Sequence, residues 1–379
     1  MRAEGFGIEI RATDGSARTG RLTTAHGVVE TPAFMPVATY GAVRGISVME
    51  LEAIGSQILL SNTYHLHERP GEGVIAGLGG LHGFTGWTGP WLTDSGGFQV
   101  TSLSDRMKID DDGVTFASPL DGRRRRLTPE GVVAIQEALG SDIAMVLDEC
   151  LPPLAEGDAA PPTARLEAAM QRSLRWAARA ARARKRPDQA LFGIVQGGVD
   201  AGLRGHSAEA TAEIGFDGHA HGGLGLGETR EQRRMAIEVA HAHLPPDRPR
   251  YLMGLGRPVD LLDGIACGID LFDCVVPTRN GRHGLLFTHQ GILSLRSAVY
   301  RDSDEPIDAS CDCPACSRHS RGYLRHLLKT GDALGPRLTA LHNLRFYHEL
   351  LERARRAIDE GRFEALRAEV ERTGEHRLG

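Results

Sequence analysis

The stretch YLMGLGRPVDLLDGIACGIDLFD, residues 251–273, carries a clear signal of how this chain folds. It holds two short apolar runs, Tyr251–Met253 and Ile269–Phe272, separated by a segment with apolar residues at helical spacing. Short apolar runs bounded by glycine or polar residues indicate buried parallel strands. The stretch therefore predicts a strand, a helix and a second strand.

The same unit recurs along the chain. Further strand candidates are Ile58–Leu60, Trp91–Thr93, Ile143–Leu147, Leu191–Val195 and Gly218–Leu226. Helices are predicted at Pro129–Leu139, between the cap Thr128 and Gly140, and at Thr229–His243, before two prolines. So many alternations favour a closed (β/α)8 TIM-type barrel, although periodicity alone leaves a doubly wound open sheet possible.

Three cysteines near the C-terminus predict a metal site. Cys311, Cys313 and Cys316 place three thiolates within six residues, which one tetrahedral zinc can collect, whereas a disulfide joins only two. A structural site needs a fourth ligand, and both His319 and His342 are available. The sequence therefore predicts one structural Zn²⁺, and the spacing alone does not choose between the two histidines.

Other patterns set the domain organisation. Val114–Ala117 and Arg124–Leu127 flank Asp121-Gly122 and predict an inserted hairpin. Beyond Pro277 the alternation lapses, and a helix from Leu338 to Glu360 follows the cysteines. We expect residues 1–379 to form a single catalytic barrel domain with a zinc-binding subdomain at residues 279–350. The sequence has neither a signal peptide pattern nor about 18 consecutive apolar residues, so we expect a cytoplasmic protein.

Polar residues follow the predicted strands at their carboxyl ends. They are Asp94, Asp148, Gln196, Gly223, Met253 and Asp273. That end of a β/α barrel carries the chemistry in enzymes of this architecture. Buried carboxylates without partners are costly, so several at one rim indicate acid, base or nucleophile work rather than only helix caps and salt bridges.

Several longer motifs resemble one known family. They are TPAFMPV (31–37), NTYHL (62–66), DSGGFQ (94–99), DEC (148–150), YLMG (251–254), FDCVVPTRNGR (272–282) and the cysteine cluster. Together they resemble the bacterial queuine tRNA-ribosyltransferases, also called tRNA-guanine transglycosylases, over nearly the whole chain. The resemblance implies a barrel enzyme with a zinc-binding insertion that exchanges guanine at the tRNA wobble position for 7-aminomethyl-7-deazaguanine in queuosine biosynthesis.

The resemblance also implies roles for single residues. Asp273 would attack the ribose as nucleophile, Asp94 would serve as acid and base, and His342 would be the fourth zinc ligand. The chemistry would be a double displacement through a covalent ribosyl-aspartate, as in a retaining glycosidase, and no nucleotide cofactor would be needed. From the residues alone, either Asp94 or Asp273 could reach the sugar.

A base pocket can be argued from donor and acceptor chemistry. An ionised Asp148 can accept from the guanine ring N–H and amino group, while the Gln196 amide and the Gly223 N–H can donate to its carbonyl. The Leu224 carbonyl and Glu228 would favour the aminomethyl cation. Tyr251 or Met253 would cover the ring, and Cys150 would line the pocket.

One segment departs from the family pattern. The chain reads GGLGLGE at residues 222–228, where the family usually has Ala and Val at the positions of Gly225 and Leu226. The bulkier Leu226 predicts a preference for a small incoming base over queuine.

The charge distribution allows only local contact with RNA. Formal charge is −5 overall, but the segment from Arg279 to the end holds 17 Lys and Arg against 14 Asp and Glu. Arg279 and Arg282, directly after the nucleophile motif, are the strongest RNA candidates. A helical stripe of arginines at Arg172, Arg175, Arg179, Arg182 and Arg186 is better explained as a solvated face.

The resemblance to the family also implies that the protein forms a homodimer.

Two other functions remain open at this point. A metal hydrolase would use H-x-H pairs as ligands, and the chain has them at His65/His67, His219/His221 and His241/His243. A non-catalytic RNA-binding subunit would have lost its carboxylates, so Asp94, Asp148 and Asp273 argue against it.

Overall fold

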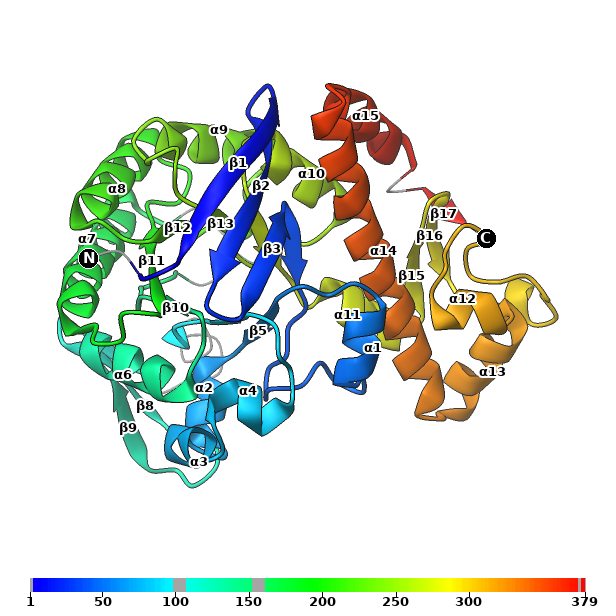
Figure 1. The fold of residues 1–379 in the computed structure, drawn as a ribbon, viewed down its shortest axis with the longest axis horizontal. Coiled ribbons are helices and arrows are strands. Elements are labelled where there is room, and N and C mark those ends of the chain that lie inside the picture. Colours follow the sequence, from blue (N-terminus) through cyan, green and yellow to red (C-terminus); the bar gives the residue numbers. More distant parts are fainter. Residues whose placement is uncertain (1–2, 98–106, 152–160, 374–375, 379) are drawn as a thin grey trace.

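The computed structural model describes residues 3–97, 107–151, 161–373 and 376–378, and Figure 1 shows its fold. Eight parallel strands form one sheet, and consecutive strands in the sheet order are β4 (Ala33–Met35), β14 (Leu271–Asp273), β13 (Arg250–Leu252), β12 (Gly218–His221), β11 (Ala190–Val195), β10 (Ile143–Met145), β6 (Trp91–Thr93) and β5 (Leu59–Ser61). The end strands also meet, because Val37 bridges Leu60 and the Ala38 amide donates to the Leu60 carbonyl over 2.7 Å. The barrel prediction is confirmed, and the open sheet is excluded.

Helices connect the strands. In chain order they are α1 (Val48–Ala53), α2 (Thr63–Glu68), α3 (Glu72–Gly77), α4 (Gly80–Thr85), α6 (Pro129–Leu139), α7 (Thr163–Ala183), α8 (Ala201–Ile214), α9 (Arg230–His241), α10 (Pro258–Ala266) and α11 (Val276–Arg282). The predicted helix at 129–139 has the predicted bounds, since the Thr128 side chain accepts from the Gly131 amide and Gly140 adopts a left-handed φ of 75°. The strand predicted at 218–226 was too long, because the chain leaves the sheet after His221.

An antiparallel meander closes the amino end of the barrel. It consists of β1 (Gly7–Asp14), β2 (Ala17–Thr24) and β3 (Gly27–Thr31), none of which the sequence analysis identified. Leu22 and Val29 share a buried cluster with barrel residues such as Met35 and Leu271. Arg18 pairs with the fully buried Asp270, one residue before β14. The carboxyl end of the barrel is thereby left as the end available for a site.

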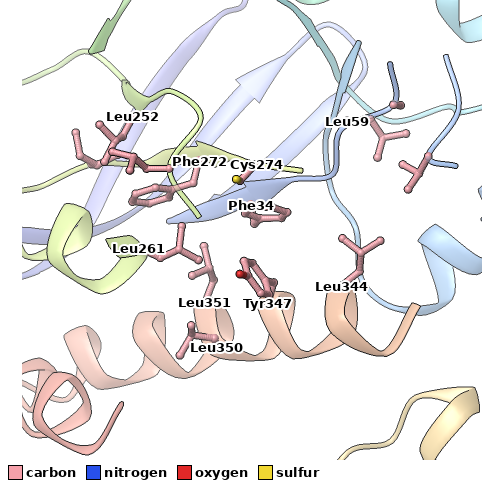
Figure 2. Close-up of a cluster of buried hydrophobic side chains, with 14 of the residues drawn as sticks. Phe34, Leu59, Leu252, Leu261, Phe272, Cys274, Leu344, Tyr347, Leu350 and Leu351 are labelled. Carbon is pink, nitrogen blue, oxygen red and sulfur yellow. The ribbon is translucent and has the colours of Figure 1, made fainter. Parts of the chain in front are cut away.

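The long helix α14 (Leu334–Asp359) covers the outside of β4 and β14. Figure 2 shows Leu344, Tyr347 and Leu351 of this helix facing Phe34 and Phe272 of the two strands. Helix α14 thus occupies the place of the eighth barrel helix. Between α11 and α14 the chain makes an excursion through β15 (Leu285–Thr288), β16 (Gly291–Ser294), a 3-10 turn (Ala298–Tyr300), α12 (Pro314–Arg318) and α13 (Arg321–Thr330), and after α14 it ends with α15 (Phe363–Thr373) and β17 (Arg377–Leu378).

The predicted hairpin is present within a three-stranded sheet. Its strands are β7 (Lys108–Asp110), β8 (Gly113–Ala117) and β9 (Arg124–Leu127). Arginines of α7 hold this insertion, since Arg175 pairs with Asp111 over 2.7 Å and Arg179 donates to the Asp111 carbonyl over 2.9 Å. This part of the arginine stripe therefore has intramolecular partners. A search of the described residues found no helix with the length and hydropathy needed to span a membrane.

Candidate active site

Three of the candidate site residues come two positions after the last inward-facing residue of their strand. Successive side chains of a strand point to opposite faces, so residues two apart share a face. A Cβ on Gly193 would meet Thr211 of α8, and Phe272 packs outward against α14, so their neighbours Ile194 and Leu271 point inward, as we infer for Leu92 in β6. Residues Asp94, Gln196 and Asp273 lie two positions beyond these inward residues. The alternation along each strand therefore aims the polar groups at the open end of the barrel.

A cavity of about 410 Å³ lies at this end. Eight of the predicted site residues line it, namely Asp94, Asp148, Cys150, Gly223, Leu224, Tyr251, Met253 and Asp273. Gln196 reaches the same place through a hydrogen bond to Asp148, and Glu228 lies behind the loop that forms one wall. The structure thus gathers residues from six different strand ends around one space.

The two carboxylate oxygens of Asp273 differ in their hydrogen bonds. Its Oδ1 accepts from the Tyr251 hydroxyl over 2.6 Å and from the Gly254 amide over 2.8 Å. Among the described residues, no donor reaches Oδ2. Burial raises the pKa of Asp273, and the two donors act against that rise. Either Tyr251 or Met253 was predicted to cover the base, and of these the Tyr251 ring is almost completely buried, with its hydroxyl on the carboxylate.

Asp94 lies at the end of β6 in a cradle of donors. It accepts from the Asn62 side chain over 2.5 Å, from the Thr63 amide over 3.0 Å and from the Gly96 amide over 3.1 Å. The charge of Asp94 contributes to raising the pKa of Tyr251, which places this carboxylate near the Tyr251–Asp273 pair. Hydrogen bonds to an ionised carboxylate stabilise its charged form. Two carboxylates therefore face the same cavity.

Asp148 and Gln196 form a polar pair at the cavity wall. The Gln196 Nε2 donates to the Asp148 Oδ2 over 2.6 Å. Burial raises the pKa of Asp148 to about 6, so the carboxyl group titrates near physiological pH. A Cβ on Gly222 would lie 2.6 Å from the Gln196 Nε2, and one on Gly223 would lie 2.5 Å from the Gln196 Oε1. Only glycine lets the backbone approach this amide so closely.

Glu228 holds the loop of residues 222–228 in one conformation. Its carboxylate accepts from the Gly225 amide over 2.6 Å and from the Leu226 amide over 2.9 Å, and it pairs with Arg233 over 2.7 Å. These donors keep the pKa of Glu228 below its usual value despite burial. Gly225 adopts a φ of 77°, with Leu255 side-chain atoms 3.0 Å from where a Cβ would lie. The glycine that departs from the family pattern suits this backbone.

Four buried side chains form a group that could hold a metal ion. They are Cys311, Cys313, Cys316 and His342. The three sulfurs lie 3.6, 3.6 and 3.3 Å from the His342 Nδ1. A tetrahedral zinc with ordinary bond lengths has S···N separations of about 3.5 Å. The Nε2 of His342 contacts the Phe287 carbonyl at 2.9 Å, which orients the ring as second-sphere bonds do in metal sites.

Among the H-x-H pairs, His65 lines the cavity, but its pair partner His67 contacts Glu72 at 2.7 Å, and neither belongs to a group of potential metal ligands among the described residues. His221 contacts His241 of α9 at 2.9 Å and Arg204 of α8 at 3.0 Å, so it points into the helix layer. Both ring nitrogens of His219 are buried without a partner. The second group of potential ligands among the described residues is His26, His82 and Asp142, at the amino end of the barrel. The geometry at the open end gives no support to a metal hydrolase.

Three arginines lie together beside the cavity. Arg279 and Arg282 belong to α11, which begins shortly after Asp273, and Arg44 lies in the loop after β4, the neighbour of β14. Burial and the charges of Arg44 and Arg279 lower the pKa of Arg282. In the described part of the chain, none of the three forms an ion pair.

Sequence reasoning missed Asn62 and Arg44. Asn62 follows the predicted strand Ile58–Leu60, so the rule that identified the other rim residues could have included it. No comparable signal marked Arg44, because its place depends on the pairing of β4 with β14.

Comparisons with known proteins agree with this geometry. A sequence model described as "Queuine tRNA-ribosyltransferase" matches residues 13–376. The chain is 54% identical to the queuine tRNA-ribosyltransferase of Solidesulfovibrio magneticus, with 94% of this chain and 95% of the relative covered. It is 52% identical to that of Thermus thermophilus, with 94% and 91% covered. The resemblance found in the motifs is confirmed, and the chain belongs to the queuine tRNA-ribosyltransferase family.

Proposed function

We propose that this enzyme replaces guanine at the wobble position of tRNA anticodons with 7-aminomethyl-7-deazaguanine, a step of queuosine biosynthesis. The observation that carries the proposal is the meeting of two carboxylates, Asp94 and Asp273, with the Asp148–Gln196 pair around one cavity. One carboxylate can attack a ribose, the other can move a proton, and the polar pair can read a guanine edge.

The exchange proceeds by double displacement. Asp273 attacks the ribose C1′, the C1′–N9 bond breaks, and N9 of the departing guanine takes the proton of Asp94, which enters this step protonated and is left as the carboxylate. The incoming base then gives its N9 proton to Asp94, attacks C1′ and releases the Asp273 carboxylate. Charge and atoms balance, because each base leaves or enters as a neutral molecule. The wobble base must first be unstacked, as single-stranded RNA bases commonly are when proteins read them.

Base recognition rests on complementary donors and acceptors. The ionised Asp148 accepts from the ring N–H and amino group, and the Gln196 amide and Gly223 N–H donate to the carbonyl. Cys150 and Met253 line the pocket around the ring. The guanine and the 7-deazaguanine share this edge, so the same groups serve both.

The aminomethyl group is recognised by the loop of residues 222–228. Because a peptide unit is planar and trans, the Leu224 carbonyl points away from Glu228 when the Gly225 N–H donates to Glu228. The carbonyl can then accept from the aminomethyl cation, with Glu228 fixing the peptide. Leu226 also lines the cavity and limits its size. Comparable exchange rates for queuine and the aminomethyl base would contradict this size limit.

Other parts of the chain support the reaction. One zinc ion bound by Cys311, Cys313, Cys316 and His342 stabilises a subdomain at residues 279–350, within a single catalytic barrel domain of residues 1–379. The separate buried cluster around the cysteines, which includes Leu286 and Leu324, supports such a unit. Zinc supplies no chemistry to the exchange.

Arg279 and Arg282 bind phosphates of the tRNA. The enzyme works in the cytoplasm, and two copies of the chain form a homodimer. Light scattering of a homodimer would give twice the 40.9 kDa of one chain.

Incorporation of labelled guanine tests the proposed function. Wild-type protein, mixed with tRNA that has guanine at the wobble position, is expected to transfer label into the tRNA. Asp273→Asn keeps the size of the side chain and should abolish incorporation. If the wild-type protein incorporates no label, base exchange is refuted.

A further inference from the structure

We infer that Tyr251 is a positioning residue that fixes Oδ1 of Asp273 and thereby makes Oδ2 the attacking atom. The inference rests on the proposed function and adds to it which oxygen reacts and what holds it. Tyr251 or Met253 was expected to cover the base, and the positioning role inferred for Tyr251 is a different one.

The strand register brings the two residues together. In the parallel pair of β13 and β14, Tyr251 lies opposite Leu271 and Leu252 lies opposite Phe272. Tyr251 and Leu271 both belong to the inner cluster, and Asp273 occupies the next inward position. The Tyr251 side chain therefore extends along the barrel interior, and its hydroxyl reaches Asp273 from the amino-terminal side of the strand.

Both hydrogen bonds fall on the same oxygen. The Tyr251 hydroxyl donates over 2.6 Å and the Gly254 amide over 2.8 Å, each to Oδ1. A lone pair engaged by two short bonds is a poorer nucleophile than a free one. Oδ2 has no donor among the described residues, and Asp273 lines the cavity in which the ribose would be bound.

The ring of Tyr251 cannot easily move. Only 1% of its surface is exposed, and it is packed among barrel residues. Burial and the neighbouring Asp273 carboxylate raise the pKa of Tyr251 well above its usual value, so it remains a donor. Such a preorganised donor costs no reorganisation when the carboxylate reacts.

The covalent step can be written with this assignment. Oδ2 forms a bond to C1′ as the C1′–N9 bond breaks, and the electron pair of that bond goes to N9, which Asp94 protonates. During attack the negative charge of Asp273 is consumed, and Oδ1 becomes the carbonyl oxygen of the ester. When the incoming base displaces the ester, the charge returns to a carboxylate that Tyr251 and Gly254 again stabilise.

The experiment measures kcat for guanine exchange against pH at saturating tRNA in wild-type protein and Tyr251→Phe. Losing a hydrogen bond to a charged group should lower kcat roughly 10- to 100-fold, with KM for tRNA within about twofold. The hydroxyl lowers the pKa of Asp273, so its removal should move the acid limb, the low-pH side of the kcat profile, to higher pH. The other titratable groups around this cavity are His65, Asp94, Asp148, Cys150 and Cys274, and none of them is altered, so their titration is common to both proteins.

Tyr347→Phe is the matched control. Tyr347 is also fully buried, and its hydroxyl donates to the Gly256 carbonyl rather than to a site residue. It should keep the wild-type kcat and acid limb. If Tyr251→Phe does not fold, 3-fluorotyrosine at position 251 replaces it; its more acidic hydroxyl is a stronger donor and should move the acid limb to lower pH.

The outcomes separate the two claims. If the protein altered at position 251 keeps the wild-type acid limb, the positioning role is overturned, whatever the value of its kcat. If the wild-type protein itself exchanges no guanine, the proposed function fails and the inference fails with it. A shifted acid limb in Tyr251→Phe alone, with KM unchanged, supports the inference.

Discussion

Asp148 illustrates how burial sets the chemistry of a single side chain. Only 8% of its surface is exposed, and burial raises the pKa of its carboxyl group to about 6. Gln196 opposes this rise by donating a hydrogen bond, but it does not cancel it. The proposed role of Asp148 requires two acceptor positions, which only the ionised form offers.

Guanine binding should therefore weaken in acid. The raised pKa means that Asp148 is ionised above about pH 6 and becomes protonated as the pH falls through that value. Below pH 6 the affinity for guanine should fall by about tenfold per pH unit. Calorimetric titration from pH 5 to pH 8 measures this. Asp148→Asn should bind weakly with little pH dependence, and a wild-type affinity that is constant across the range would contradict the role.

The path of the loop between β12 and α9 depends on glycine at two positions. Gly222 and Gly223 pack directly on the Gln196 amide, with no room for a Cβ. The contact joins the ends of two neighbouring strands, β11 and β12. The pocket wall is therefore an assembly of two elements rather than a property of either one.

Gly222→Ala should displace Gln196 and weaken base binding. Its Cβ would lie 2.6 Å from the Gln196 Nε2 and 2.7 Å from the Ile194 side chain, distances at which an atom must move. We expect KM for the incoming base to rise roughly tenfold, the loss of about one hydrogen bond. Gly73→Ala, in helix α3 with nothing within 4 Å of the added Cβ, is the control. Equal KM values for Gly222→Ala and wild-type protein would show that Gln196 does not read the base.

The sequence predicted the elements with strong local patterns and missed those defined by pairing. Helix α6 was predicted with its caps, because Thr128 and Gly140 have local roles. Strand β4 has three residues between two prolines, so it became a strand only through its pairing with β14. The same pairing places Arg44 near Arg282. His319 and His342 were equally plausible ligands by spacing, and only the packing of α14 brings His342 to the cysteines.

At the scale of the whole molecule, the cysteine group joins the excursion after α11 to helix α14. His342 is fully buried on a helix whose other face packs on β4 and β14. Metal binding there would link the C-terminal excursion to the barrel wall.

Removing the metal should destabilise the protein without altering chemistry in the cavity directly. We expect one zinc per chain by elemental analysis, and a chelator or His342→Ala should lower Tm by about 5 °C or more. His319→Ala is the matched control and should keep both zinc and Tm. Full zinc content in His342→Ala would refute its role as a ligand.

The arginine cluster should contribute to tRNA affinity through phosphate contacts. Replacing Arg279 and Arg282 with Ala should weaken tRNA binding and reduce its dependence on salt, because fewer counterions are released. Arg175→Ala, which removes an exposed arginine already paired with Asp111, should have little effect. Binding assays at two salt concentrations measure both quantities. An unchanged affinity and salt slope in the double variant would exclude these residues from RNA contact.

The central claim is that Asp273 forms a covalent bond to the ribose during exchange. The most direct measurement is a denaturing gel of enzyme mixed with labelled tRNA, followed by mass spectrometry of the RNA-linked peptide. We expect a protein–tRNA adduct in wild-type protein, located at Asp273 and absent in Asp273→Asn. An adduct at Asp94, or exchange by Asp273→Asn at the wild-type rate, would contradict it.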